Sequence, residues 1–88
     1  MPITTTWNPR TLTNAANAEG LTFEQVQKLM AGLRDQDVRG LVDYAKETDM
    51  ASLKDWQKAF TSIFAKMNDA ESSAVIRIAI TLSGGVVI

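Results

Sequence analysis

The sequence predicts a mainly α-helical single domain, a small orthogonal bundle of four to five helices that spans residues 1–88. Three observations predict this fold. Apolar side chains recur at helical spacing over residues 52–69, helix start signals occur at several places, and the β-prone segments are few and short. A chain of this length buries roughly 60 to 65% of its unfolded surface on folding, which suits one core.

The most regular element is a helix over residues 52–69. Ser52 supplies an N-cap hydroxyl and Asp55 follows three residues later, a variant of the capping box. Apolar side chains lie on one face at spacings of three and four residues, namely Leu53, Trp56, Phe60, Ile63 and Met67, with Phe64 beside them. We expect this helix to form the main wall of the core.

The N-terminal part predicts an extended arm and a short helix. Residues 3–7 are β-prone but too short for a core, so we expect residues 1–7 to form an extended arm that Trp7 anchors. Asn8 and Pro9 are typical of an N-cap and a first helical position, and Gly20 suits the left-handed position that ends a helix. The thin apolar face of this helix means that it depends on docking.

A helical hairpin follows. Thr22 and Gln25 form a capping box for a helix that runs to about Arg34. Asp37 is then predicted to cap a second helix, which closes near Thr48. The inner face of this second helix comprises Val38, Leu41, Val42 and Ala45.

Residues 74–82 fit two structures. Four Val or Ile residues alternate as in a strand, and a strand here would give an α+β domain. A buried helix fits as well, because Ser73, Arg77 and Thr81 are spaced by four and Gly84 suits a C-cap. We favour the buried helix, followed by a C-terminal tail over residues 83–88.

Composition excludes several kinds of chemistry. The chain has no Cys and no His, so disulfides, thiolate chemistry and imidazole ligands are absent. Its formal charge is −1, which removes the usual electrostatic reason to expect nucleic acid or an anionic membrane as a partner. No signal peptide and no apolar run of bilayer length is present. We expect no cofactor and a cytoplasmic location, or a virion if the protein is viral.

The carboxylates suggest catalysis only weakly. Three pairs are candidates, namely Asp35 with Asp37, Asp43 with Glu47, and Asp69 with Glu71. Each pair is explained by a helix start or by a solvated helix face. We therefore expect no enzyme activity.

The sequence matches two ligand-binding motifs in part, a calcium-binding loop and a DNA-binding helix-turn-helix. A calcium loop that starts at Asp35 would place Gly40 correctly, but Arg39 and Lys46 would occupy ligand positions that need oxygen. The hairpin over residues 22–46 resembles a helix-turn-helix in outline only, because Asp43 and its acidic neighbours oppose phosphate. Neither metal nor DNA is the expected ligand.

The expected function is therefore protein binding. We predict a structural or adaptor subunit that self-associates or joins a larger assembly, such as a virus-like one. An inhibitor or regulator of a single protein target is the alternative, and a DNA-binding regulator comes third. The predicted interface comprises Trp7, Arg10, Lys54, Lys58, Lys66, Val86, Val87 and Ile88.

Overall fold

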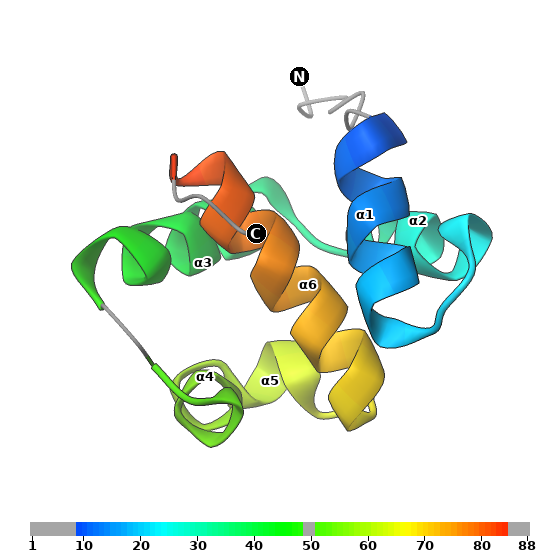
Figure 1. Ribbon diagram of the computed structural model, residues 1–88. Coiled ribbons are helices and arrows are strands. Elements are labelled where there is room, and N and C mark those ends of the chain that lie inside the picture. Colours follow the sequence, from blue (N-terminus) through cyan, green and yellow to red (C-terminus); the bar gives the residue numbers. More distant parts are fainter. Residues whose placement is uncertain (1–8, 49–50, 85–88) are drawn as a thin grey trace.

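The computed structural model describes residues 9–48 and 51–84, and these residues form six helices and no strand (Figure 1). The helices are α1 (Pro9–Glu19), α2 (Phe23–Ala31), α3 (Asp35–Glu47), α4 (Leu53–Ala59), α5 (Thr61–Phe64) and α6 (Asp69–Leu82). The radius of gyration of 11.8 Å is close to the roughly 12 Å expected for a compact chain of this length. The mainly α-helical fold class is confirmed for these residues.

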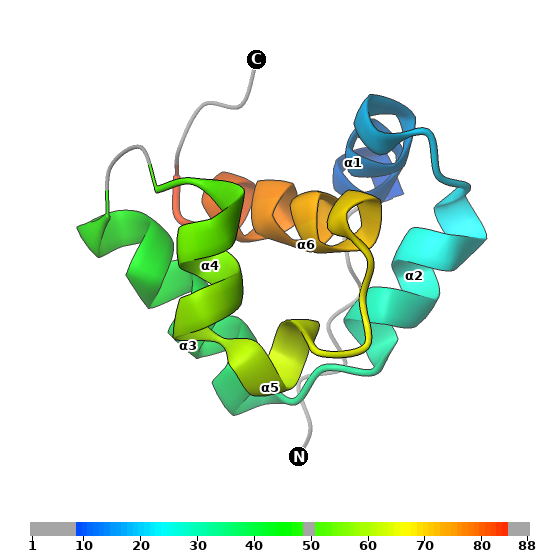
Figure 2. The same cartoon turned by 90° about the horizontal axis from the view of Figure 1, so that it is seen from below.

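Helix α6 is the centre of the fold. It packs against α1, α2, α3 and α4, with α1 and α2 on one side and α3 and α4 on the other (Figures 1 and 2). A helix enclosed in this way is apolar around most of its circumference. Its buried side chains are Ser72, Ala74, Val75, Ile76, Ile78 and Ala79. The predicted buried helix over residues 74–82 is confirmed, and the strand alternative is wrong.

The single helix predicted over residues 52–69 is wrong. The chain instead forms α4, breaks at Phe60 and continues as the one-turn helix α5 before a turn leads into α6. The apolar stripe does face inward, since Trp56 and Phe64 are buried and the other four side chains pack against the core. Because the segment is divided, α6 and not this segment forms the main wall of the core.

The break at Phe60 has a tertiary cause. Phe60 leaves helical geometry at φ −127° and ψ 52°, and its ring meets Tyr44 edge-on at 5.3 Å between centroids. Trp56 completes the cluster, with its ring 4.6 Å from Tyr44 and 6.1 Å from Phe60. A Cβ on Gly40 would lie 3.4 Å from the Phe60 ring, so the glycine lets Phe60 approach α3 closely.

The carbonyls freed at the end of α4 find a partner in Thr61. Its single hydroxyl proton is shared between the carbonyl oxygens of Gln57, 3.3 Å from Oγ1, and Lys58, 3.1 Å from Oγ1. A hydroxyl in this position replaces backbone N–H donors that a continuous helix would have supplied. Thr61 therefore compensates in part for the backbone hydrogen bonds lost at the break.

The two predicted capping boxes are confirmed. The Thr22 hydroxyl accepts from the Gln25 N–H at 3.1 Å while the Gln25 side chain accepts from the Thr22 N–H at 2.9 Å. Ser52 and Asp55 exchange the same pair of bonds at 3.2 and 3.0 Å. These boxes determine where α2 and α4 begin.

Two start signals differ from the prediction. Helix α3 begins at Asp35, so Asp37 is not the N-cap but lies in the first turn and accepts from the Arg34 N–H at 3.2 Å. Asn68 and Glu71 form a third capping box, at 2.8 and 2.9 Å, that starts α6. The regular apolar stripe on both sides of residue 68 hides this signal, because it predicts one helix through residue 69.

Two glycines end helices as predicted. Gly20 after α1 and Gly84 after α6 have φ values of 71° and 92°, in the left-handed region that favours glycine. Helix α1 exposes one face and buries Leu12, Ala15 and Ala16 against its neighbours α2 and α6. Its stability thus depends on docking, as the thin apolar face predicted.

Candidate functional site

One hollow in the described residues lies between the C-terminal end of α2, the α2–α3 connection and the region of α5. Its volume is about 520 Å³. We call it the basic groove. Four half-buried apolar side chains line it, namely Leu29, Leu33, Ile63 and Met67. Such a surface can receive an apolar side chain from outside.

The rim of the basic groove is cationic. Lys28, Arg34 and Lys66 are exposed and line it, together with a single carboxylate, that of Asp37. That carboxylate already accepts the Arg34 N–H at the start of α3. The groove therefore combines apolar walls with an excess of positive charge.

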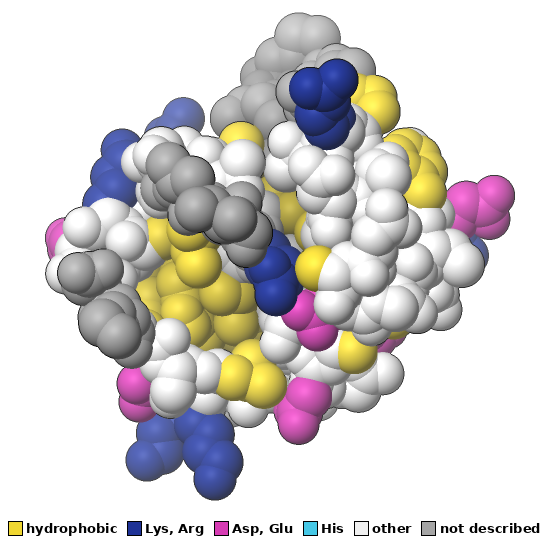
Figure 3. Space-filling view, viewed as in Figure 1, with side chains coloured by type: hydrophobic (Ala, Val, Ile, Leu, Met, Phe, Trp, Pro, Cys, Tyr) yellow, Lys and Arg dark blue, Asp and Glu magenta, His cyan; other side chains and the backbone are white. Residues whose placement is uncertain are grey.

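A second hollow lies between α4 and α6 and has a volume of about 260 Å³. We call it the α4–α6 hollow. Leu53 and Trp56 from α4 and Ile76 and Ile80 from α6 supply its apolar walls. Figure 3 shows apolar side chains gathered in the region between α3, α4 and α6. Two charged side chains, Glu19 and Arg77, line this hollow, whereas four line the basic groove.

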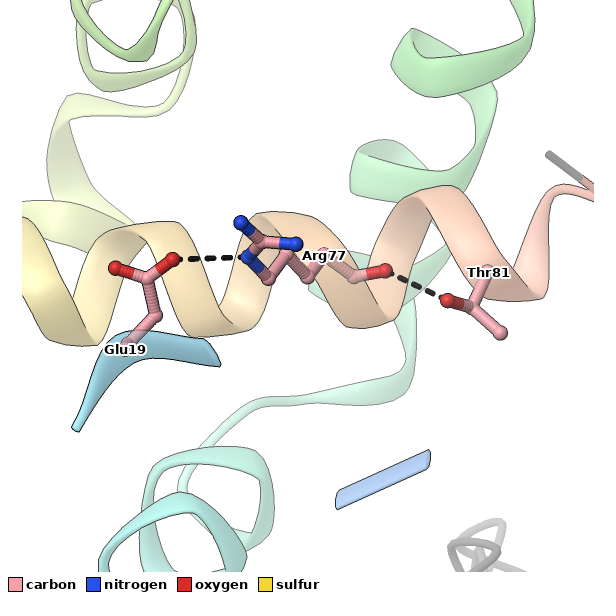
Figure 4. Close-up of polar contacts among 3 residues, drawn as sticks. All are labelled: Glu19, Arg77 and Thr81. Atoms are coloured by element: carbon pink, nitrogen blue, oxygen red, sulfur yellow. Dashed lines mark hydrogen bonds and ion pairs between the residues drawn. The ribbon is translucent and has the colours of Figure 1, made fainter. Parts of the chain in front are cut away.

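An ion pair borders the α4–α6 hollow. Arg77 Nε donates to Glu19 Oε2 at 2.8 Å and joins the middle of α6 to the last residue of α1 (Figure 4). The Thr81 hydroxyl donates to the Arg77 carbonyl at 2.9 Å one turn further along. The predicted polar stripe of α6 therefore includes a link between two helices.

The predicted lysine row is divided. Lys54 and Lys58 are exposed one turn apart on α4, whereas Lys66 lies beyond α5 and lines the basic groove. Arg10 is exposed near the start of α1. Trp7 and the tail residues Val86, Val87 and Ile88 lie outside the described residues. Lys66 thus lines one groove with Lys28 and Arg34, which are not part of the interface predicted from sequence.

The candidate carboxylates have structural roles or face solvent. Asp37 and Glu71 accept backbone N–H groups at helix starts, and Asp69 accepts from Gln57 Nε2 at 3.1 Å. Asp43 and Glu47 are exposed on α3. Within residues 9–48 and 51–84, no three carboxylates gather as a metal site would require. Asp35 begins α3, so the calcium loop considered from sequence has helical geometry instead.

The hydrogen bonds of its helix cap lower the pKa of Asp55. The backbone N–H of Ser52 lowers the pKa of Asp55 below its usual 3.8, and the Ser52 side chain lowers it further. Hydrogen bonds to a carboxylate favour its charged form. This shift belongs to the helix cap and not to a reactive group.

The chain matches no known family, no curated protein and no solved structure. In the part of the chain that the structure describes, no helix has both the length and the apolar character needed to cross a bilayer. The features that bear on function are therefore the two hollows and the charges around them.

Proposed function

We propose that this protein is a non-enzymatic structural subunit that self-associates, and that the basic groove receives an acidic surface of a second copy. The observation that carries the proposal is the gathering of three cations around an apolar groove on a chain whose net charge is −1. Complementary charge directs the approach of two surfaces, while the apolar walls supply affinity.

The charges outside the groove support a second copy as the occupant. The chain has nine basic and ten acidic side chains, and the groove takes three basic and one acidic. The remainder therefore carries six basic and nine acidic side chains, a net charge of −3. Asp43 and Glu47 on α3 belong to that acidic remainder and are exposed.

A groove that meets a different surface of the next copy makes a head-to-tail contact. Such contacts close into rings or continue as filaments, depending on the rotation between neighbours. This geometry suits a subunit that builds an assembly, whether from copies of itself alone or within a larger complex.

Analytical ultracentrifugation tests the proposal. We expect the mean mass to rise with protein concentration and to fall as salt is added, since salt screens exposed charges beyond about 8 to 10 Å. The double variant Lys28→Glu/Lys66→Glu should abolish association. The matched control, Lys54→Glu/Lys58→Glu, makes the same change in charge on α4 and should still associate.

The two variants also distinguish the groove from the predicted lysine row on α4. If only the α4 variant failed to associate, the interface would include Lys54 and Lys58, and the proposed role of the basic groove would be refuted. A constant monomer at every concentration would refute self-association. It would favour the alternative of an inhibitor or regulator that binds one other protein.

A DNA-binding role ranks third. Helices α2 and α3 follow one another after a short turn, but both pack on α6 and not on each other, so the helical hairpin predicted from sequence is not formed. The acidic residues of α3 would also meet phosphate repulsion in a groove of DNA. These residues are Asp35, Asp37, Asp43 and Glu47. Duplex binding at low ionic strength that weakens steeply with salt would reverse this ranking.

A further inference from the structure

Two large apolar side chains in the described residues are exposed, those of Phe23 and Leu82. Phe23 is the first residue of α2 and is 36% exposed, and the residue that follows it, Glu24, is exposed as well. A phenyl ring and a carboxylate are therefore presented at adjacent positions at the start of α2. We call Phe23 and Glu24 the α2 knob.

The Glu24 carboxylate is available to an external cation. Within residues 9–48 and 51–84 it makes no ion pair and no hydrogen bond. Lys28 lies one turn further along α2 but does not pair with it. The negative charge of the α2 knob is therefore not neutralised by a contact within the described part of the chain.

The exposed carboxylates of α3 and α4 lie in a different setting. On the exposed surface of α3, Asp43 and Glu47 alternate with Arg39 and Lys46, so opposite charges offset one another. Asp55 on α4 has one lysine directly before it and another three residues after it. Neither α3 nor α4 has an exposed large apolar side chain. The α2 knob thus combines two properties that these helices do not combine.

Phe23 and the basic groove lie on opposite sides of α2. Successive residues of an α-helix are rotated by about 100°, so the groove residues Lys28 and Leu29 lie about 140° and 120° around the axis from Phe23. They also lie about 7 to 9 Å further along the helix. Helix α2 runs along the edge of the molecule in Figure 2, with the groove at its C-terminal end. A chain therefore cannot place its own Phe23 ring in its own groove.

The α2 knob and the basic groove have complementary chemistry. The groove volume of about 520 Å³ lies within the range of about 300–1,000 Å³ that is typical of clefts that bind ligands, and the groove walls are apolar. Aromatic rings contribute strongly to interfaces when such walls bury them. A carboxylate next to the ring would meet the cations of the rim, namely Lys28, Arg34 and Lys66.

We infer that the α2 knob of one copy occupies the basic groove of the next, with the Phe23 ring on the apolar walls and the Glu24 carboxylate on the cationic rim. Each copy then uses a different surface at each of its two contacts, which is a head-to-tail arrangement. The inference rests on the proposed function, because it names the surface that the basic groove receives.

Analytical ultracentrifugation of the full chain tests the inference. In the knob variant, Phe23→Ser/Glu24→Gln, the ring and the charge are removed, and we expect the dissociation constant of self-association to rise at least tenfold. The matched control, Leu82→Ser/Glu47→Gln, removes the other exposed apolar side chain and one exposed carboxylate, and it should associate like the native chain. The knob variant keeps the capping box of α2, so circular dichroism should show unchanged helicity.

Mixing two variants provides a second readout. The knob variant keeps a native groove, and the groove variant, Lys28→Glu/Lys66→Glu, keeps a native knob. We expect each to be monomeric alone at a concentration at which the native chain associates. The mixture should form a dimer with one copy of each variant and nothing larger, because one native contact remains. A mixture that stays monomeric would overturn the inference.

The outcomes separate this inference from the proposed function. If the knob variant associates like the native chain while the groove variant does not, the inference is overturned and the proposed function stands. If the native chain is monomeric at every concentration, both are overturned. Equal loss of association in the knob variant and its control would also overturn the inference, because the α2 knob would then have no particular role.

Discussion

Substitution of Ser72 should stabilise the protein, whereas most substitutions in a core destabilise it. The Ser72 side chain is 0% exposed, and its hydroxyl oxygen has no hydrogen-bond partner. A buried polar group left unsatisfied costs about 1–3 kcal/mol. Ser72→Ala removes that group, and alanine also has the higher helix propensity, so we expect the free energy of unfolding to increase by about 1 kcal/mol.

Ser73→Ala is the matched control on the neighbouring residue of α6. Ser73 is only partly buried, so its substitution should give the propensity gain alone, at most about 0.5 kcal/mol. Urea unfolding with unchanged slope measures both values, and 1 kcal/mol corresponds to a rise in Tm of about 4–8 °C for a domain of this size. A Ser72→Ala protein that is less stable than the native chain, or no more stable than Ser73→Ala, would refute the reasoning.

Three further predictions concern helix ends and their links. Gly20→Ala should lower the free energy of unfolding by about 1 kcal/mol, because the φ of Gly20 is 71°. Gly32→Ala should raise it by about 0.5 kcal/mol, because Gly32 has a φ of −79° and an added Cβ would make ordinary contacts of 3.6 Å. Urea unfolding of both variants measures the two effects. A double-mutant cycle of Glu19→Gln and Arg77→Gln should give a coupling of about 0.5–1 kcal/mol, and additive effects would contradict the ion pair. The pKa of Asp55 is lowered in the folded state, so the ionised Asp55 carboxylate should stabilise the fold fully at neutral pH. This stabilisation should disappear as the pH falls below about 3.8. The free energies of unfolding of the native chain and Asp55→Asn should then converge in acid.

The division of the segment over residues 52–69 changes the functional argument as well as the fold. In a continuous helix, Lys54, Lys58 and Lys66 would share one exposed face. The break at Phe60 separates them, and Lys66 lines the basic groove with Lys28 and Arg34. The charge-reversal variants on α4 and in the groove therefore test which of the two arrangements carries the interaction.

Local signals in the sequence determined most helix boundaries. The capping boxes at Thr22 and Ser52 and the left-handed glycines at positions 20 and 84 depend only on residues within one turn, so sequence spacing alone reveals them. The inward direction of the apolar stripe was predictable for the same reason. Asn68 with Glu71 carries an equally local signal, which was hidden by the regular stripe around it.

The tertiary structure alone decided the break at Phe60 and the composition of the basic groove. Phe60 leaves the helix where its ring meets Tyr44 and lies close to Gly40, and no Gly or Pro in its own segment signals this break. Lys66 lines the groove with Lys28 because the segment after α5 and the end of α2 border the same hollow. Helical periodicity describes one segment at a time, whereas both features arise from contacts between segments that are distant in the chain.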